Sequence, residues 1–583
     1  MLTKQTTVSP GRPQVDIPTK PIRHFLPQEL TIDSWNKIEP FFIDLKQRSI
    51  SSPNELEQWL FDRSELEAAL SEDMGWRYIK MTCDTTNKEL LDSFNFFVNE
   101  IEPFIAPYNN ELNIKFVKSP YLRELDQKKY HIHIRGIKKA LEIYREENIP
   151  LLTKISTESQ KYAAISGAMT IEWKGEEITL QKAASFLKDT DRAVREAVFY
   201  KIQKRREEEK DKLNDLFSEL IQLRHQVALN AGFENYRDYK FAELGRFDYT
   251  VQDCFNFHQS IAKEILPLTE ASDLERKKLL KLDTLKPWDM DVDVEGKPAL
   301  KPFEGGTELT DKSIECFYNV RFAYGEYLEI MKSIRHLDLE SRIGKAPGGY
   351  LYPLYEIGVP FIFMNAVGTH RDMLTMVHEG GHAIHSFVTR DLEITDFKST
   401  PAEVAELASM SMELISMEHW EVFLKNSDDL KRAKKEALQQ VLKTLLWIAA
   451  VDKFQHRIYE NPAHTVEERM EAWVNIIALF DSKVVDWTGL ENMKARQWQN
   501  QLHIFEVPFY YIEYGMAQLG AIAVWRNYKR NPEQALDAYE AALRLGYTKS
   551  IPEIYKTAGI EFNFSQEYVK ELADFVKSEL EKL

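Results

Sequence analysis

The segment His378-Glu379-Gly380-Gly381-His382 combines residue types that could hold a metal ion and move a proton. Four residues of an α-helix turn through about 400°, so the two imidazole rings would share one face, one turn apart. That spacing lets both rings bind the same metal ion. Glu379 would lie about 100° around the helix from His378, within reach of a water molecule at the metal but outside the ligand set. The pattern therefore predicts a metal centre with a general base beside it.

A third ligand must come from another segment, because a catalytic zinc ion commonly has three protein ligands and one open position. The next expected helix, within residues 401–414, carries Glu403, Glu406 and Glu413 among Ala, Val, Met and Leu side chains. Carboxylates on such an apolar face are costly to bury unless they are paired or bind a metal. The spacing leaves both Glu403 and Glu406 as alternatives for the third ligand.

The two glycines between the histidines bear on how the expected helix packs. Glycine inside a helix lowers its stability by about 1 kcal/mol per residue relative to alanine. The pair Gly380 and Gly381 therefore indicates that another segment approaches the helix closely at this point. The main alternative for the whole pattern is a structural one, in which His378 and His382 only pack or form hydrogen bonds within a helix.

Together these residues resemble the thimet oligopeptidase and oligoendopeptidase F family of zinc peptidases, and within it the oligoendopeptidase F branch. The family pattern is His-Glu-x-Gly-His-x-x-His, followed by Glu-x-x-Ser and a further Glu four residues after the serine. Here the first part runs from His378 to His385, and the second contains Glu406, Ser409 and Glu413. The resemblance implies that Glu406 is the third zinc ligand and that Glu413 orients a ligand histidine. His385 extends the same helix face and would hydrogen-bond a neighbour rather than the metal.

A second part of the resemblance lies near the C-terminus, where His503 is followed by a Pro-Phe-Tyr-Tyr-x-x-Tyr block that ends at Tyr514. Peptide hydrolysis through a tetrahedral oxyanion needs hydrogen-bond donors beside the metal. The expected donors are His503, Tyr510 or Tyr511, and Tyr514, with positions 503, 510 and 514 on one helix face. An aromatic stripe of the core is the alternative for any single tyrosine, and the sequence leaves the choice among them open.

The Gly- and Tyr-rich segment before the histidine helix is a candidate for substrate binding. The family binds its substrate along the edge of a β-strand there, by strand addition. The resemblance thus implies that Gly348, Gly349 or Tyr350 lines this edge. An ordinary hairpin without a binding role is the alternative.

These residues require a mostly helical framework. Apolar residues recur at helical spacing through most of the chain from residue 32 onward. Residues 169–180 instead alternate apolar and polar on both sides of Lys174-Gly175, which predicts a β-hairpin. Residues 340–367 are rich in glycine and in β-forming residues, which predicts a small β-sheet next to the zinc helix.

The domain organisation follows from the same patterns. Residues 1–30 hold five prolines, so we expect an extended lead segment that packs on the body or stays loose. Residues 31–200 would form an N-terminal helical lobe with the hairpin, and residues 201–583 a catalytic helical region with the zinc site. The resemblance implies a two-lobed helical ellipsoid with a deep central channel and the zinc on its floor. Such a narrow channel would admit short, unfolded peptides and exclude folded proteins.

Composition excludes several other classes of protein. The chain has 583 residues, of which 75 are basic and 92 acidic, and a net charge of −17, so it would repel nucleic-acid phosphates. Its longest apolar run, residues 445–451, is far shorter than the roughly 20 residues of a membrane span. The N-terminus lacks the apolar core of a secretory signal, and the three separated cysteines make neither a disulfide framework nor a Cys-rich zinc site. We expect an acidic cytoplasmic protein with no membrane or nucleic-acid partner.

The sequence and the resemblance together predict an enzyme: a zinc-dependent endopeptidase with one Zn²⁺ per chain and short peptides as substrates. Glu379 would transfer protons, while the zinc ion would activate water and polarise the peptide carbonyl. One alternative is an exopeptidase of the same architecture, such as a dipeptidyl carboxypeptidase, for which the sequence offers no recognisable cationic clamp. The other is a non-catalytic helical peptide-binding protein, which would have no reason to keep Glu379.

Overall fold

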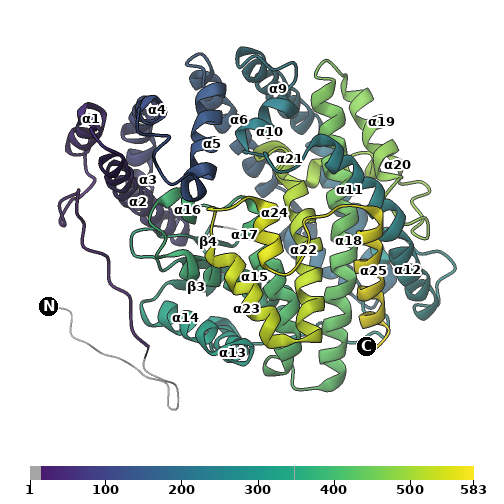
Figure 1. Cartoon of the computed structure of the whole chain (residues 1–583). Helices are drawn as coiled ribbons and strands as arrows, with labels where there is room; N and C mark the ends of the chain where they lie inside the picture. The colour runs from purple at the N-terminus through teal and green to yellow at the C-terminus, as the bar shows by residue number, and fades with distance from the viewer. Residues whose placement is uncertain (1–14, 347) are drawn as a thin grey trace. The chain divides into compact units, whose positions relative to one another are not determined.

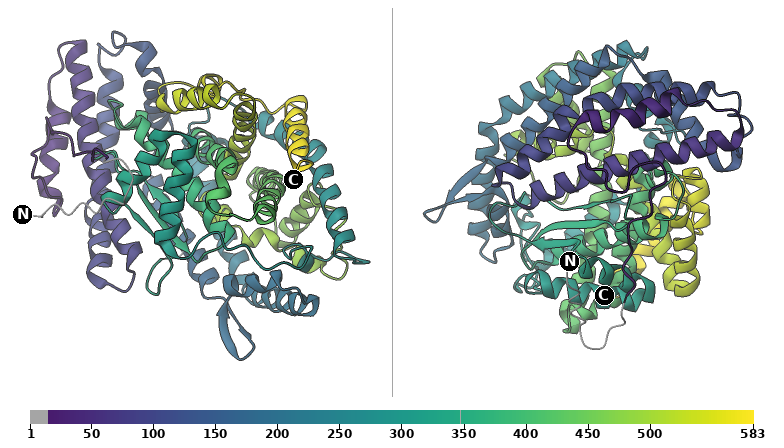
Figure 2. Two further views of the ribbon diagram at one scale, coloured as in Figure 1. Left: turned by 90° about the horizontal axis from the view of Figure 1, so that it is seen from below. Right: turned by 90° about the vertical axis from the view of Figure 1, so that its left-hand side faces the viewer.

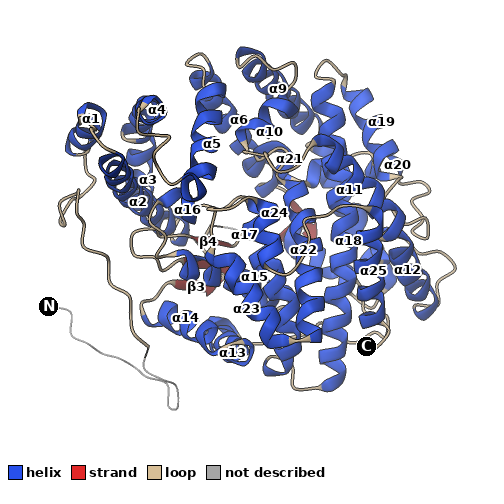
Figure 3. Ribbon diagram, in the orientation of Figure 1, coloured by secondary structure: helices blue, strands red, loops and turns tan. Residues whose placement is uncertain are grey.

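Helices make up most of the described residues, 15–346 and 348–583, in the computed structural model of the chain (Figure 3). This confirms the prediction of a mostly helical protein. The chain divides into two compact units, and each gathers three separate segments of the sequence. Unit 1 comprises Met1–Leu141, Leu300–Lys431 and Gly520–Phe562, and unit 2 comprises Glu142–Ala299, Arg432–Leu519 and Asn563–Leu583.

None of the divisions between the units falls at residue 30 or 200, the limits expected from the sequence. Three helices continue from one unit into the other: α5 (Gln127–Ile143), α18 (Ser427–Glu460) and α22 (Tyr511–Arg530). Because each unit is assembled from distant segments, local composition and spacing could not mark its limits. The lobes and the channel implied by the resemblance stay predictions.

Unit 1 is built from helices of three sequence segments, most of which are labelled in Figure 1. Two short 3₁₀ helices, η1 (Trp35–Lys37) and η4 (Met417–Val422), accompany them. Its α-helices are α1 (Glu39–Gln47), α2 (Pro53–Cys83), α3 (Lys88–Glu100), α4 (Glu102–Lys118), α13 (Gly305–Val320), α14 (Phe322–Ser333), α15 (His370–Thr389), α16 (Thr395–Lys398), α17 (Ala402–Ser416), α23 (Pro532–Arg544) and α24 (Ile551–Thr557).

Unit 2 is also helical. Among the described residues of both units, no helix is both long and apolar enough to span a bilayer. Its 3₁₀ helices are η2 (Phe186–Lys188), η3 (Pro287–Asp289) and η5 (Gln497–Asn500). Its α-helices are α6 (Asn148–Gly167), α7 (Leu180–Ser185), α8 (Arg192–Glu208), α9 (Lys210–Asn230), α10 (Tyr236–Glu243), α11 (Val251–Glu264), α12 (Leu266–Leu279), α19 (Val466–Ile477), α20 (Glu491–Lys494), α21 (Leu502–Glu506) and α25 (Gln566–Leu580).

Unit 2 contains the hairpin expected at residues 169–180. Strand β1 (Thr170–Trp173) pairs antiparallel with β2 (Glu176–Thr179). Lys174 and Gly175 connect them with φ of 53° and 85°, the positive values that a two-residue type I′ turn requires. In Figure 2 this hairpin, coloured blue, extends away from the helices around it.

The small sheet predicted beside the histidine helix is confirmed in unit 1. It contains β3 (Leu337–Glu340), β4 (Tyr350–Tyr352) and β5 (Phe361–Ala366), in the order β3-β5-β4. Strand β5 pairs parallel with β3 and antiparallel with β4, and five of its six residues are buried. The central position of β5 leaves β4 as an edge strand of this sheet.

Helix α15, which carries the paired histidines, begins with a capping box. Asp372 N donates to Thr369 Oγ1 at 3.2 Å, and Thr369 N donates to Asp372 Oδ2 at 2.9 Å. These bonds satisfy backbone donors that have no partner inside the helix. The capping box fixes the point at which the helix starts, and hence the face on which His378 and His382 lie.

The paired glycines of α15 are sites of close approach, as their presence in a helix predicts. A Cβ atom on Gly381 would lie 2.6 Å from the Cα of Ser409 in α17, and one on Gly380 would lie 2.3 Å from the Phe317 ring in α13. Any larger residue would push these helices apart. The glycines thus allow α17, which carries the candidate carboxylates, to reach the histidines.

The described part of the lead segment, residues 15–30, has no helix or strand and packs on unit 1. Lys20 Nζ lies 2.7 Å from carboxylate oxygens of both Glu72 and Glu356. Arg23 Nε lies 2.5 Å from Glu356. These ion pairs hold the segment against α2 and the loop after β4; residues 1–14 of the lead segment lie outside the described residues.

Candidate active site

Three of the predicted ligands meet between α15 and α17 in unit 1. One ligand atom each of His378, His382 and Glu406 lies within 4.8 Å of the other two. Glu406 Oε2 is 3.4 Å from His378 Nε2 and 3.7 Å from His382 Nε2, so both rings present Nε2 to the same carboxylate. Two imidazole nitrogens and one carboxylate oxygen form a ligand set that suits catalytic zinc.

The structure separates the two carboxylates that spacing alone left as alternatives. Glu403 is buried in α17 and does not belong to either group of metal-ligating side chains found among the described residues. Its backbone carbonyl accepts a hydrogen bond from the Tyr555 hydroxyl at 3.0 Å. Glu406, one turn further along α17, is the carboxylate that faces the histidines.

Hydrogen bonds hold the candidate ligands in place. His378 Nδ1 lies 2.6 Å from Glu413 Oε1, so Nδ1 carries the proton that the carboxylate accepts. This interaction fixes the ring and leaves Nε2 for a metal ion. Ser409 Oγ donates to Glu406 Oε2 at 3.0 Å, which orients the carboxylate from one turn away. Ser409 and Glu413 are the two residues that follow Glu406 in the family pattern.

The electrostatics of the cluster suit a cation. Burial raises the pKa of Glu406, but the hydrogen bond to His378 and the nearby imidazoles outweigh it and lower the pKa to about 2. Burial lowers the pKa of His378, but its hydrogen bonds to Glu406 and Glu413 outweigh burial and raise it well above the usual value. Burial lowers the pKa of His382 to about 4. The cluster thus provides an ionised carboxylate, a neutral imidazole and strong attraction for positive charge.

Glu379 lies beside this cluster and is almost completely buried, with 7% of its surface exposed. Burial raises its pKa to about 7; the charge of His378 opposes this rise, as does a hydrogen bond from the Leu351 backbone. A carboxyl group with a pKa near neutrality can both accept and return a proton at physiological pH. The bond from Leu351 also places strand β4 next to Glu379.

The predicted substrate segment leads into the edge strand β4, with Gly348 and Gly349 before the strand and Tyr350 as its first residue. Gly348 has a φ of 98°, which favours glycine, and a Cβ there would meet nothing within 4 Å. A Cβ on Gly349 would lie 3.4 Å from the Phe363 carbonyl oxygen of β5. The Tyr350 side chain stacks on Phe363 with ring centroids 4.8 Å apart and lies 2.6 Å from the Thr82 hydroxyl. Packing within unit 1 therefore occupies the Tyr350 ring.

His385 is buried on the side of α15 that packs against α23. Burial lowers its pKa to about 3, and a hydrogen bond with the Leu543 backbone opposes this. The structure groups it with neither set of metal-ligating side chains among the described residues. Its position agrees with contact to a neighbour rather than to a metal ion.

His503 and the three tyrosines lie together in unit 2. The centroid of the His503 ring is 6.2, 4.9 and 5.9 Å from those of Tyr510, Tyr511 and Tyr514. The expectation that positions 503, 510 and 514 share one helix face is wrong, because His503 belongs to α21 and Tyr514 to α22. The helical conformation is interrupted between them at Pro508, which lacks an N–H, and at Phe509, which has a φ of 66°.

Neighbouring side chains fix the tautomer of His503. Trp447 Nε1, which can only donate, lies 2.8 Å from Gln501 Oε1. The other end of this amide, Gln501 Nε2, lies 2.7 Å from His503 Nδ1 and must donate to it. The proton of the neutral His503 ring is therefore on Nε2.

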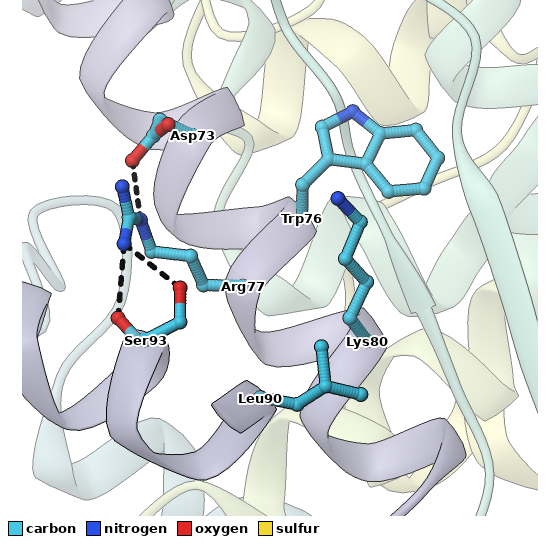
Figure 4. Close-up of a pocket in the computed structure, with 6 residues that line it drawn as sticks. All are labelled: Asp73, Trp76, Arg77, Lys80, Leu90 and Ser93. Atoms are coloured by element: carbon cyan, nitrogen blue, oxygen red, sulfur yellow. Dashed lines mark hydrogen bonds and ion pairs between the residues drawn. The ribbon is translucent and has the colours of Figure 1, made fainter. Parts of the chain in front are cut away.

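A pocket of about 140 Å³ in unit 1 is lined by none of these residues (Figure 4). Arg77 is already bonded within it, to Asp73 at 2.6 Å and to the Ser93 hydroxyl at 2.9 Å. A pocket this small, with its guanidinium engaged, offers no recognisable ligand site. Its lining residues are Asp73, Trp76, Arg77, Lys80, Leu90 and Ser93.

A second group of metal-ligating side chains, not predicted from the sequence, lies in unit 2. Cys254, Asp452 and His456 in unit 2 each offer one ligand atom within 4.8 Å of the other two. A sequence signal existed: Cys254 and His258 are four residues apart in α11, and Asp452 and His456 are four apart in α18. Neither pair carries the general base that distinguishes the segment at 378–382.

Comparison with known proteins assigns the chain to a family. Residues 185–574 match the model of peptidase family M3, and residues 25–144 match the peptidase M3 N-terminal domain. The first match alone covers more than half of the chain, so the chain belongs to peptidase family M3. It is therefore an enzyme of the peptidase class.

Individual relatives point to one branch of this family. An oligoendopeptidase F homologue of Borreliella burgdorferi is 22% identical over 514 residues, which cover 83% of each chain. The oligopeptidase PepF of Bacillus subtilis is 24% identical over 394 residues, covering 66% of this chain and 56% of the relative. A solved structure of PZ peptidase A with an inhibitor is 26% identical, with a TM-score of 0.87 over 94% of this chain and 97% of that one. The predicted resemblance to the oligoendopeptidase F branch is confirmed.

Proposed function

We propose that this member of peptidase family M3 is a zinc-dependent endopeptidase that hydrolyses internal bonds of short oligopeptides. The observation that carries the proposal is the cluster of His378, His382 and Glu406 with Glu379 directly beside it. The similarity to oligoendopeptidases favours internal cleavage over the exopeptidase alternative. A cytoplasmic location and a narrow channel that excludes folded proteins remain parts of this proposal.

The mechanism assigns distinct tasks to the residues of the cluster. His378, His382 and Glu406 would hold the zinc ion, with Glu413 fixing the His378 ring through its 2.6 Å hydrogen bond. When bound, the zinc ion would supply Lewis-acid activation of water and of the peptide carbonyl. Glu379 would accept a proton from the attacking water and then deliver it to the nitrogen of the leaving amine. Its burial supports both steps, because a carboxyl pKa near 7 allows either protonation state.

The edge strand β4 would bind the substrate. An extended peptide can pair with the open edge of β4, and Glu379 then lies close to it, because the Leu351 backbone of β4 contacts the Glu379 carboxylate. The absence of side chains at Gly348 and Gly349 would let the peptide backbone approach. Backbone pairing of this kind tolerates many side chains, as suits an enzyme that acts on mixed peptides.

His503 and the tyrosines would stabilise the oxyanion, a role that the resemblance supplies. The tautomer set by Gln501 leaves Nε2–H of His503 as a donor, and each tyrosine hydroxyl can also donate. A donor aimed at the developing negative charge stabilises the transition state more than the ground state. Replacing the three tyrosines one at a time would identify the one that provides this donor.

The test compares two glutamates of the same helix. Glu406→Gln should lose the metal and all cleavage, whereas Glu403→Gln should keep both, as measured by elemental analysis and a quenched-fluorescent peptide. Peptides blocked at both termini, with products identified by mass spectrometry, distinguish internal from terminal cleavage. Metal retained in Glu406→Gln would show that the ligand assignment is wrong. Failure to cleave doubly blocked peptides while unblocked ones are cut would favour the exopeptidase.

A further inference from the structure

Helix α11 and the unit 2 part of α18 each bring a pair of potential metal ligands to the same buried place. Helix α11 contributes Cys254 and His258, and α18 contributes Asp452 and His456. Residues four apart share a helix face, so each pair is directed toward the opposite helix. Cys254 and Asp452 have no exposed surface, and the two histidines are each 2% exposed. Buried side chains of these types are uncommon unless they are paired or bind a metal.

We propose that Cys254, Asp452 and His456 bind a second zinc ion, one with a structural role, that ties α11 to α18. One ligand atom of each lies within 4.8 Å of the other two. Thiolate, imidazole and carboxylate together form a mixed sulfur, nitrogen and oxygen set that suits zinc, a borderline-soft ion. The proposal rests on these residues alone and does not depend on the assignment of the catalytic site.

The hydrogen bonds of the cluster leave the required atoms available. His258 Nε2 lies 2.8 Å from Asp452 Oδ2 and holds that oxygen, whereas Asp452 Oδ1 has no hydrogen-bond partner among the described residues. His456 Nε2 is 3.2 Å from Asp452 Oδ2, so this ring faces the same carboxylate, and within the described chain its Nδ1 has no hydrogen-bond partner. Buried polar atoms without a partner are rare in folded proteins, and a bound ion is one explanation. His258 would be the residue that orients a ligand carboxylate.

The surroundings of the cluster favour a metal ion whose charge is balanced by the charges of its ligands. Rings of Phe255, Phe509 and Phe241 surround His456, with centroids 5.0, 5.3 and 5.9 Å from its own. Net charge is costly in such an apolar environment. A divalent zinc ion with one thiolate, one carboxylate and a neutral imidazole has no net charge. The site therefore satisfies its ligands without an uncompensated buried ion.

The position of the cluster indicates what the ion would do. The Phe509 ring packs on His456, and Phe509 itself, with its φ of 66°, directly precedes Tyr510. A metal ion that fixes His456 would therefore stabilise the packing beneath the His503 and tyrosine group. The cluster is fully buried, so substrate cannot reach the ion, and its role would be structural.

The first experiment counts zinc in a chain from which the catalytic ligands have been removed. In His382→Ala, or in Glu406→Gln, one zinc ion per chain should remain after gel filtration with a mild chelator. Adding Cys254→Ala should reduce this to near zero, whereas adding Cys316→Ala, also a buried cysteine, should not. No zinc in His382→Ala while the wild type holds one would overturn the second site and leave the proposed function intact. Zinc retained in the chain that carries both His382→Ala and Cys254→Ala would also overturn it.

The second experiment reads the sulfur ligand directly in the full-length protein. Cobalt-substituted enzyme should show the near-ultraviolet sulfur-to-cobalt charge-transfer band, which the catalytic ligands cannot produce because they contain no cysteine. The band should vanish in Cys254→Ala and persist in Cys316→Ala and His382→Ala. Should Cys254→Ala fail to fold, Asp452→Asn and His258→Phe serve instead, the latter weakening metal affinity by roughly 10–100-fold. Stoichiometric cobalt without this band would show that Cys254, Asp452 and His456 form a metal-free hydrogen-bonded core.

Discussion

The two clusters of metal-ligating side chains differ in exposure. In unit 1 the His378 and His382 side chains are 21% and 18% exposed, and Glu379 lies beside them. In unit 2 Cys254 and Asp452 have no exposed surface, and no glutamate lies between the paired residues in the described segments 254–258 and 452–456. A catalytic metal must keep one position open for water and substrate, whereas a structural metal is enclosed by protein. The difference in exposure is the one expected if the first cluster binds a catalytic metal ion and the second a structural one.

The ligand carboxylates show the same division. Glu406 accepts a hydrogen bond from Ser409 and faces two imidazoles, and the neighbouring Glu379 is hydrogen-bonded to the Leu351 backbone of β4. Asp452 is fully buried and hydrogen-bonded to His258, and aromatic rings pack on the two histidines beside it. The neighbours of a buried carboxylate, and not its burial alone, decide what it can do.

The largest effect is expected from Glu379→Gln, which keeps the shape of the side chain but removes its basic carboxylate. Turnover should fall by about 10²–10⁴-fold or more, since Glu379 serves as both base and acid. Zinc content should stay unchanged, and substrate affinity should change little, because Glu379 is not a ligand. Elemental analysis beside steady-state kinetics on a quenched-fluorescent peptide provides the measurement. Near-normal turnover would show that the first cluster is also structural.

A smaller loss is expected from the unit 2 group of His503 and tyrosines. His503→Gln, and one of Tyr510→Phe, Tyr511→Phe and Tyr514→Phe, should each lower turnover by about 10²–10³-fold with zinc retained. The reason is loss of a donor to the oxyanion. Tyr200→Phe, at a more exposed tyrosine of unit 2, is the matched control and should be silent. Equal, small effects for all three tyrosines would indicate an aromatic core without a catalytic donor.

Gln501 provides a finer test of the same group. Gln501→Leu removes the donor to His503 Nδ1, so the ring is free to place its proton on either nitrogen. Turnover should fall, but by less than in His503→Gln, because part of the population keeps the Nε2–H form. Nitrogen chemical shifts of labelled His503 report the tautomer directly. An unchanged tautomer with full activity would show that Gln501 has no positioning role.

How far the sequence could predict these sites depends on how local each one is. The pair His378 and His382 and the base Glu379 lie within one helical turn, so spacing alone predicts them. The choice of Glu406 over Glu403 needed the family pattern, because both residues suit a buried helix face. In physical terms the tertiary structure distinguishes them, because Glu406 Oε2 lies 3.4 Å from His378 Nε2 and Glu403 belongs to neither metal-ligating group among the described residues. Spacing predicts ligands within one helix, but tertiary structure decides which partner helix completes the site.

Two features escaped prediction for the same physical reason. The pairs in α11 and α18 are far apart in the sequence, and nothing local indicates that the two helices pack together. The helix face expected for His503, Tyr510 and Tyr514 does not exist, because Pro508 and Phe509 break the chain there. The three side chains still lie together, because the backbone turns between α21 and α22 and not because they share a helix face. Long-range packing was therefore the missing information in both cases.

The next prediction concerns how the first cluster is assembled. In Gly381→Ala the new methyl group would lie 2.6 Å from the Ser409 Cα, so α15 and α17 must move apart. Such overpacking should cost about 1–3 kcal/mol of stability and weaken zinc binding. Gly136→Ala, in the exposed middle of α5 with nothing within 4 Å, should raise stability by up to about 1 kcal/mol. Urea unfolding and zinc titration of both variants check this, and equal effects would contradict it.

The last effect is a dependence of stability on pH at Asp289 in unit 2, a buried carboxylate that belongs to neither metal-ligating group found among the described residues. Arg192 Nη2 and Arg195 Nη2 each lie 2.8 Å from one of its oxygens. Burial raises the pKa of Asp289, but the hydrogen bonds from these arginines outweigh burial and lower it. Fixed cations thus provide here the charge that a metal ion would provide at Asp452.

The direction of that pKa change sets the pH dependence. Because the folded pKa is below the unfolded value of about 3.9, ionised Asp289 stabilises the fold above that pH. The contribution is lost as the pH falls through the folded pKa. The stability difference between wild type and Asp289→Asn should therefore be full near pH 6 and shrink steadily on acidification below about pH 4. Other carboxylates titrate in both chains and cancel in the difference, which urea unfolding at each pH measures.

A chelator should leave this difference unchanged while it lowers the stability contributed by the Cys254, Asp452 and His456 cluster. A difference that ignores pH, or one that changes with chelator, would show that the arginines do not neutralise Asp289 as their geometry implies.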